Sequence, residues 1–401
     1  MLKLAFKNIF RNKKRTSLTL LSVFFAAMVV GLAQGWANGI INTMISNMTK
    51  YQTGDIRITD ENFLKREKFL PVDNLIPDSA RLQSDLKKLD GVKSVEERMR
   101  FAILLGKGEK SESTIGYGLD LNESVLKVKD KLSGENKVIK PGGVYMGYRL
   151  AEKLDIKEGD EILIAVQSSE GGLNGLKLRV NGLVKMNVSV LDKKAFFMSI
   201  ETASDLLKIN DASTEIYVFL KDRKTVNTMV DTVSKILPDG VKAESYITQL
   251  GELYVTLDAG KVFYVFIEIM IMLLGSFVII NTLMMAIYER MREIGTLKSI
   301  GFTNRQLFWN FTLEGSIIGA IGGTIGAFSG YLIIVLLSVT GINLETMFSG
   351  MDAPLEYIVY PELSIIQPFI AAAVCIVIPA IASMFPSRLI NKIMPAEALR
   401  K

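Results

Sequence analysis

Four long stretches that are almost free of charge limit what this chain can fold into. They cover residues 16–38, 262–288, 315–339 and 365–385, and Glu268 is the one charged side chain among them. Each is at least as long as the roughly 20 helical residues that cross the hydrocarbon core of a bilayer. The sequence therefore predicts four transmembrane helices.

The composition indicates that only part of the chain lies in lipid. Hydrophobic residues make up 49% of the chain and the mean hydropathy is +0.29, which is too apolar for an ordinary soluble protein. Charged residues still make up 22%. We therefore expect an α-helical membrane protein with a large domain in water.

The distribution of lysine and arginine predicts the orientation. The segment 340–364 carries four acidic and no basic residues, whereas short basic segments stay in the cytoplasm. We expect both termini inside, a multi-pass protein of the cytoplasmic (inner) membrane, and an uncleaved first span. The basic residues fall in three short segments: Lys3, Lys7, Arg11, Lys13, Lys14 and Arg15; Arg290, Arg292, Lys298 and Arg305; Arg388, Lys392, Arg400 and Lys401.

The region 45–258, between the first two spans, reads as an extracytoplasmic α+β domain. Its two ends each show a strand, helix, strand pattern, and its middle is rich in strands and turns. We therefore expect a subdomain split between 45–120 and 215–258, interrupted by a β-rich subdomain at 121–214. The chain then divides into 1–44, 45–258 and 259–401.

The sequence offers no set of catalytic residues. There is no histidine, and the single cysteine, Cys375, lies in the fourth span, which excludes the usual nucleophile and metal sites that need these residues. The stretch "GKGEKS" at 106–111 lacks the spacing of a Walker A loop. We therefore expect no metal, no cofactor and no ATP hydrolysis by this chain, and the net charge of +5 gives no reason to expect a nucleic-acid partner.

A charged segment at 289–307 separates the second and third spans. Met291, Ile294, Leu297 and Ile300 recur every third residue, which predicts a short amphipathic helix. Gly301 would end this helix, and a T-x-x-Q capping box at residues 303–306 would start the next one. The same periodicity also fits an interfacial loop that simply returns the chain to the membrane.

The third span contains two rows of glycines spaced by four, which allow helices to approach closely. Generic packing between transmembrane helices explains the pattern as well as any special role. Glu268 is costly in lipid, and its position suggests the membrane interface. The glycines are Gly315, Gly319 and Gly323 in one row, and Gly322, Gly326 and Gly330 in the other.

The segment "ERMREIGTLKSIGFTNRQLFWNFTLEGSIIGAIGGTIG" resembles the signature of the FtsX and MacB family of ABC transporter permeases. Both ends of the chain are similar to that family as well, as "LAFKNIFRNKKRTSLTLLSV" and "FPSRLINKIMPAEALR" show. The stretches "TGDIRI", "GGVYMGYRLAEKLDIKEGDEI" and "QSSEGGLNGLKLRVNGLVK" resemble the MacB-type periplasmic core domain, in particular that of the lipoprotein-releasing permeases LolC and LolE.

The resemblance implies that the charged segment is a coupling helix bound by a separate ATPase. The implied partners are a dimeric ATPase subunit, a second copy of the permease or a paralogue, a lipoprotein, and a LolA-like periplasmic carrier. The loop "QSSEGGLNG" is shorter than the hairpin with which LolC captures its carrier. The implied coupling residues are Glu289, Arg290, Glu293, Ile294, Gly295, Leu297, Lys298, Ile300 and Gly301.

The expected function is ATP-driven motion that releases lipoproteins from the cytoplasmic membrane. Two alternatives stay open: export of peptides or antibiotics as by MacB, and FtsX-like signalling across the membrane to a cell-wall hydrolase or a sensor. The sequence does not distinguish a homodimer from a pair of paralogues, nor does it identify the substrate.

Overall fold

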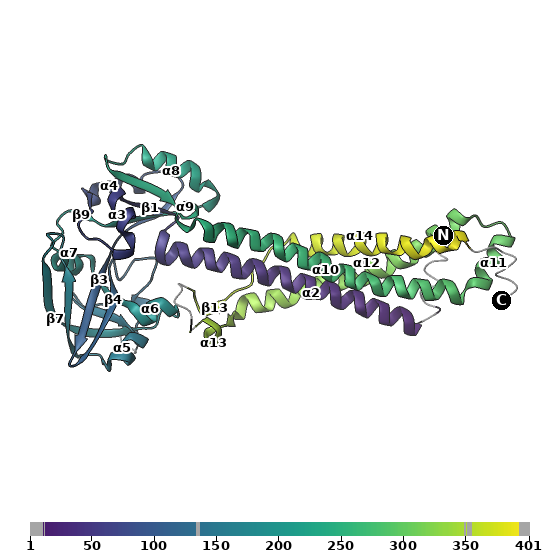
Figure 1. The fold of residues 1–401 in the computed structure, drawn as a ribbon, viewed down its shortest axis with the longest axis horizontal. Helices are drawn as coiled ribbons and strands as arrows, with labels where there is room; N and C mark the ends of the chain where they lie inside the picture. The colour runs from purple at the N-terminus through teal and green to yellow at the C-terminus, as the bar shows by residue number, and fades with distance from the viewer. Residues whose placement is uncertain (1–10, 12, 134–136, 349, 351–354, 393–401) are drawn as a thin grey trace. The chain divides into compact units, whose positions relative to one another are not determined.

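The computed structural model describes residues 11, 13–133, 137–348, 350 and 355–392. The chain forms two compact units (Figure 1). A helical unit comprises Met1–Asn42, Thr256–Ile342 and Val359–Lys401, and an α+β domain comprises Thr43–Val255 and Asn343–Ile358. Since Asn343–Ile358 lies between the third and fourth spans, the chain enters the α+β domain twice.

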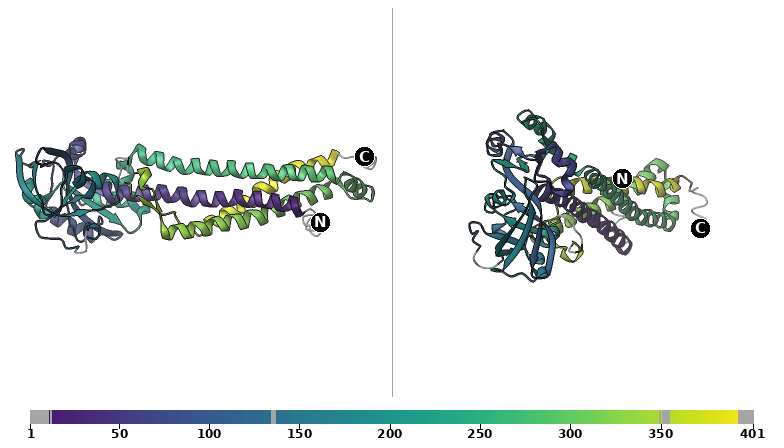
Figure 2. Two further views of the ribbon diagram at one scale, coloured as in Figure 1. Left: turned by 90° about the horizontal axis from the view of Figure 1, so that it is seen from below. Right: turned by 60° about the vertical axis from the view of Figure 1, so that its left-hand side comes forward.

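Four long helices run side by side in the helical unit (Figure 2). They are long and apolar enough to cross a membrane, and each coincides with one of the predicted charge-poor stretches. Helix α10 has 38 residues, which corresponds to about 57 Å at 1.5 Å per residue and exceeds the roughly 30 Å of a hydrocarbon core. The helices are α2 (Lys13–Met48), α10 (Glu252–Glu289), α12 (Asn304–Thr340) and α14 (Gln367–Ser387).

Shorter helical segments connect or extend these helices. The π-helical turn η1 (Thr49–Thr53) follows α2, the nine-residue helix α11 (Met291–Ser299) separates α10 from α12, and η5 (Arg388–Lys392) follows α14. The segment between α12 and α14 contains β12 (Ile342–Asn343), α13 (Glu345–Phe348) and β13 (Ile358–Val359).

One nine-stranded sheet forms the centre of the α+β domain, in the order β11-β1-β10-β3-β4-β8-β5-β7-β6. The first part of β3 pairs with β10, and its second part pairs with β4 and β6. A single sheet therefore runs through both expected subdomains. The strands are β1 (Ile56–Asp60), β3 (Val92–Lys107), β4 (Lys110–Gly118), β5 (Val144–Gly147), β6 (Glu161–Gln167), β7 (Leu173–Val184), β8 (Ala195–Met198), β10 (Glu215–Leu220) and β11 (Val241–Ser245).

The other elements of this domain are short. A two-stranded sheet joins β2 (Ile76–Pro77) to β9 (Ala212–Ser213). The helices are α3 (Glu61–Arg66), η2 (Glu67–Phe69), α4 (Ser79–Lys87), η3 (Lys129–Lys131), α5 (Tyr148–Leu154), α6 (Ser189–Lys194), α7 (Ile200–Leu207), η4 (Arg223–Thr225), α8 (Val226–Ser234) and α9 (Tyr246–Leu250).

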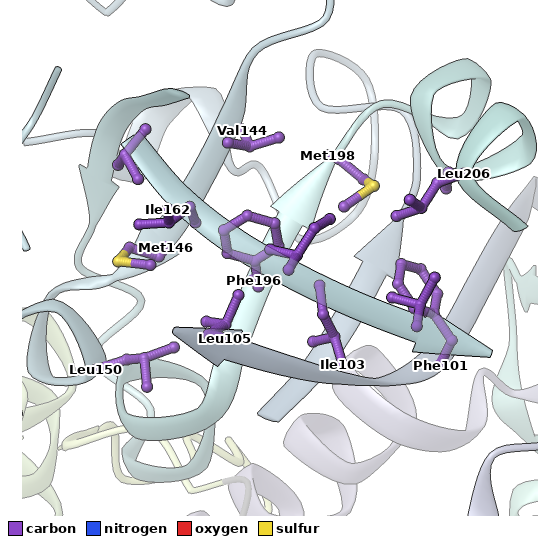
Figure 3. Close-up of a cluster of buried hydrophobic side chains, with 14 of the residues drawn as sticks. Phe101, Ile103, Leu105, Val144, Met146, Leu150, Ile162, Phe196, Met198 and Leu206 are labelled. Carbon is purple, nitrogen blue, oxygen red and sulfur yellow. The ribbon is translucent and has the colours of Figure 1, made fainter. Parts of the chain in front are cut away.

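Apolar side chains pack on both faces of the sheet. Phe101, Ile103 and Leu105 alternate along β3 and point to one face, as strand geometry requires, where they meet Phe196 (Figure 3). The next residue, Phe197, belongs to a second buried cluster. The domain therefore has enough core of its own to fold in water.

A cluster of charged side chains is buried on three neighbouring strands. Glu215 of β10 is fully buried and accepts hydrogen bonds from Arg100 of β3, from Nε at 2.6 Å and from Nη2 at 2.5 Å. Arg57 of β1 donates to Glu215 at 3.3 Å and to Glu67 at 2.5 Å. Tyr217 donates its hydroxyl to Glu215 at 3.1 Å. The two buried arginines are thus neutralised by two carboxylates.

Candidate functional site

The charged segment between the second and third spans forms a helix with well-defined ends. Gly301, with φ of +102°, lies just beyond α11, where a left-handed residue favours glycine. The capping box at the start of α12 is present: Gln306 N donates to Thr303 Oγ1 at 3.3 Å, and Thr303 N donates to Gln306 Oε1 at 2.9 Å. The local predictions of a helix, a stop and a new start are confirmed.

The apolar stripe of α11 is divided between two environments. Ile294 is buried and packs with Leu307 and Phe311 of α12, and Leu297 is partly buried against the same cluster. In contrast, 69% of Ile300 is exposed. The first part of the stripe therefore holds α11 to the chain's own core, and Ile300 is the apolar member that faces outward.

Charged contacts connect α11 and the end of α10 to distant parts of the helical unit. Arg11 donates to Glu293 at 2.5 Å, and Arg15 of α2 forms an ion pair with Glu289. The sequence had suggested only an orientation signal for these basic residues, since composition does not reveal their partners.

Two further contacts involve basic residues of the charged segment. Arg290 is buried and lies 3.6 Å from Glu314 of α12. Lys298 donates to the Ile390 carbonyl oxygen at 2.7 Å, and burial lowers the pKa of its ammonium group. Of the other expected coupling residues, Gly295 is buried within α11.

A cavity of about 370 Å³ adjoins α11 and the start of α12. Apolar side chains such as Leu297, Phe302 and Leu307 line it, together with Arg11 and Glu293. This combination of apolar walls and a charged rim is typical of a surface that contacts another protein.

The two glycine rows of α12 lie against different helices. An added Cβ at Gly326 would lie 2.3 Å from the Phe24 carbonyl oxygen of α2, and one at Gly330 would lie 2.6 Å from the Met28 carbonyl oxygen. Gly322 also lies against α2. These distances require glycine, because real Cβ atoms do not approach backbone atoms so closely.

The second glycine row lies against α14. An added Cβ at Gly319 would lie 2.5 Å from Pro379 Cβ, and one at Gly323 would lie 2.5 Å from Cys375 Cβ. Gly315 lies against Ser383 in the same way. Helix α12 is therefore packed between α2 and α14.

The segment between α12 and α14 is anchored on the α+β domain. Glu356 pairs in an isolated antiparallel bridge with Val188, and it accepts hydrogen bonds from Lys50 Nζ at 2.9 Å and from the Tyr51 hydroxyl at 2.5 Å. Burial alone would raise the pKa of Glu356, but the Tyr51 and Lys50 contacts outweigh it and lower the pKa. Glu356 is therefore ionised at neutral pH.

Further contacts hold the same segment in place. Tyr357 is buried, and its amide donates to the Asn187 carbonyl oxygen at 2.9 Å. Arg149 donates to Glu345 at 3.0 Å. We call Asn343–Ile358 the anchored segment. From the sequence, only the acidic charge of this segment was noted. That charge was the one sign in the sequence that basic residues of the domain would bind it.

The chain next to the anchored segment packs against α2 within the helical unit. The Glu362 amide donates to the Gly35 carbonyl oxygen at 3.1 Å, and Asn42 Nδ2 donates to Glu362 Oε2 at 2.5 Å. An added Cβ at Gly39 would lie 2.6 Å from Pro361 Cα. This loop and α2 are therefore in direct backbone contact.

Comparison with known proteins identifies two matching families. The model of the MacB-like periplasmic core domain matches residues 16–236, and the model of the FtsX-like permease C-terminal region matches residues 265–395. Together they account for most of the chain and correspond to the regions on which the resemblance was based.

Three curated relatives match over about three quarters or more of their length. The chain is 23% identical to the ABC transporter permease YtrF of Bacillus subtilis, over 98% of this chain and 97% of YtrF. It is 21% identical to the lipoprotein-releasing system transmembrane protein LolC of Xylella fastidiosa, over 73% of this chain and 74% of LolC. It is also 21% identical to the lipoprotein-releasing system transmembrane protein LolE of Haemophilus influenzae, over 79% of this chain and 80% of LolE. The chain therefore belongs to the FtsX and MacB family of ABC transporter permeases.

Proposed function

We propose that this permease is the transmembrane subunit of a mechanotransmission ABC transporter that extracts lipoproteins from the cytoplasmic membrane. The observation that carries the proposal is the continuity of α2 and α10, each of which belongs in part to the helical unit and in part to the α+β domain. Because helices as long as α2 and α10 are stiff, we expect that a displacement of their membrane-spanning parts also displaces the α+β domain to which their ends belong. The anchored segment adds a further connection.

The proposal places the termini and α11 in the cytoplasm and the α+β domain outside. A cysteine at Ser169, in a Cys375→Ala background, is expected to react with an impermeant thiol reagent in intact cells or spheroplasts, whereas one at Asn304 is not. The fraction of each cysteine that reacts is measured with a thiol reagent that adds a mass tag, before and after the cells are lysed. Labelling of Asn304→Cys from outside would reverse the orientation.

A separate dimeric ATPase is the proposed partner of α11, and the permease pairs with a second copy or a paralogue. Ile300→Asp places a charge on the exposed part of the stripe. If this surface is buried in the complex, the ATPase should bind at least about tenfold more weakly, as co-purification and titration of the purified partner would measure.

A matched control for this change exists in the α+β domain, where 41% of Ile236 is exposed. Ile236→Asp should leave ATPase binding unchanged. Intact binding and unchanged ATPase activity in Ile300→Asp would show that α11 is not the coupling element.

The anchored segment should transmit motion only while it stays bound to the domain. Glu356→Gln replaces the charge-assisted hydrogen bonds to Lys50 and Tyr51 with weaker neutral ones. The equilibrium between the bound and the detached anchored segment should therefore shift toward the detached form by about tenfold or more. The amide of Tyr357, which donates to the Asn187 carbonyl oxygen outside the segment, should exchange faster, and ATP should be consumed with less release of substrate.

Glu170→Gln is the control for this variant, because the Glu170 side chain is 67% exposed in its ion pair with Lys208. It should change neither amide exchange nor release. Native exchange rates in Glu356→Gln would contradict the proposed role of the anchored segment.

An exposed apolar surface on the sheet supports a lipid-modified substrate or its carrier. Leu163 of β6 and Leu173 of β7 are 55% and 81% exposed. Leu104 of β3 is 50% exposed and lies on the same face as Leu163, since it pairs with Ala165. The similarity to LolC and LolE points to the same substrate class.

Extraction of a lipoprotein requires an energy source, because each buried CH₂ group contributes about 0.8 kcal/mol. Proteoliposomes that contain the permease, its ATPase and a triacylated lipoprotein should release the lipoprotein to a soluble LolA-like carrier only with ATP. Depletion of the permease in cells should leave lipoproteins in the cytoplasmic membrane. Unaltered sorting, together with altered sensitivity to a peptide or macrolide, would favour export instead.

A further inference from the structure

A groove of about 520 Å³ lies between α2 and α12, toward the N-terminal end of α2. On α2 its lining residues are spaced three and four apart from Lys13 to Phe24, so they form one face of the helix. On α12 the lining includes Ile321 and Ile325. All of these residues belong to the helical unit.

The chemistry of the groove changes along its length. Lys13 and Ser17 line one end, and Leu20, Leu21 and Phe24 line the rest. Within a bilayer, apolar walls face hydrocarbon chains, and long basic side chains near helix ends reach the headgroup region. A phospholipid carries its charged and apolar parts in the same order.

The basic residues at the start of α2 differ in whether they are already paired. Arg11 and Arg15 form ion pairs with Glu293 and Glu289. Lys13 has no ion pair with any residue that the structure describes, and the Ser17 hydroxyl can donate a hydrogen bond. The groove therefore presents a positive charge where the phosphate of a lipid would lie.

We propose that an anionic phospholipid of the leaflet on this side binds in the groove, with its phosphate at Lys13 and an acyl chain against Leu21 and Ile325. The site is independent of the lipoprotein substrate proposed above. Its occupant covers the apolar wall between the two helices and neutralises the charge of Lys13.

The composition of the wall favours a lipid over a helix from a second copy. Close packing between transmembrane helices relies on small residues, and Gly322, which lines the groove, already lies against α2. Away from the end with Lys13, Thr16 and Ser17, the wall carries bulky branched and aromatic side chains, such as Leu21, Phe24 and Ile325. Flexible acyl chains cover such a surface more readily than a second helix does.

Native mass spectrometry of the full-length chain from nanodiscs with equal amounts of phosphatidylglycerol and phosphatidylcholine tests the proposal. We expect the wild type to retain phosphatidylglycerol preferentially. Lys13→Gln should retain about fivefold less, because it loses the ion pair between Lys13 and the lipid phosphate. Leu21→Trp should also reduce retention, because the larger side chain fills the groove.

Two matched controls lie beside these positions. Lys14→Gln removes the same charge next to the groove, and Leu18→Trp adds the same volume at a leucine that is 67% exposed; neither Lys14 nor Leu18 lines the groove. Both controls should retain lipid as the wild type does. A photoactivatable phosphatidylglycerol should crosslink to the wild-type chain within residues 13–24.

Three results would overturn the proposal. One is equal retention of both lipids by the wild type, and another is equal loss of lipid in Lys13→Gln and Lys14→Gln. The third is efficient disulfide formation between two copies of Leu21→Cys in the membrane, which would assign the groove to a second permease.

Discussion

Gly326→Ala is expected to lower the free energy of unfolding of the helical unit by about 3 kcal/mol, the upper part of the range for overpacking. The new Cβ would lie 2.3 Å from the Phe24 carbonyl oxygen and 2.9 Å from Ala27 Cβ. A backbone atom cannot turn aside as a flexible side chain does, so α2 and α12 must separate and lose contact along the row.

The two tryptophans of the chain report on this helix pair, because Trp36 lies on α2 and Trp309 on α12. Denaturant unfolding in detergent, followed by tryptophan fluorescence, measures the change. Gly260→Ala is the matched control, since its Cβ would lie 3.8 Å from Ile41 Cδ1, an ordinary contact, and alanine favours a helix over glycine. Equal stability of both variants would contradict close packing at Gly326.

Glu215→Gln is expected to destabilise the α+β domain by about 3–5 kcal/mol, the cost of breaking a buried ion pair. The amide would leave Arg57 and Arg100 close together without the carboxylate that neutralises them. Both arginines are almost completely buried, so water cannot replace the lost charge. Denaturant unfolding, followed by circular dichroism in the full-length chain, measures the loss.

Glu67→Gln changes the same cluster at its exposed edge and serves as the comparison. The Glu67 side chain is 39% exposed, so we expect a cost of at most about 1 kcal/mol, as for surface ion pairs. Comparable losses in the two variants would show that burial does not determine the strength of the cluster.

Glu67 also gives the cluster a defined pH dependence. Burial alone would raise its pKa, but the hydrogen bond and charge of Arg57 outweigh it, and the pKa lies below the usual value. Its contribution to stability is therefore complete above the unfolded pKa of about 4.3 and is lost as the pH falls through the lower folded pKa. Glu67→Gln should show a weaker loss of stability in this acidic range.

Features that depend on neighbouring residues were predictable from the sequence. A span needs only a long enough run of apolar residues, and the capping box needs only Thr303 and Gln306 at the right spacing. The glycine rows were visible for the same reason, although the sequence did not indicate that one row lies against α2 and the other against α14.

Features that join distant residues were not predictable. The chain has 47 basic and 42 acidic residues, so composition cannot select Arg11 with Glu293 or Arg100 with Glu215. Periodicity placed Ile294 and Ile300 on one stripe of α11 but did not show which faces the chain's own core. The continuity of the sheet through β3 likewise depends on pairing with β10, more than a hundred residues later in the chain.

The contacts between α2 and the loop before α14 restrict insertions and deletions during evolution. The loop meets one face of α2 at Gly35, Gly39 and Asn42. One residue inserted into α2 between Gly35 and Gly39 would rotate Gly39 and Asn42 by about 100° relative to Gly35, so the loop could no longer contact all three positions. Relatives that alter the length of α2 here need a compensating change in the loop, or an insertion close to whole helical turns.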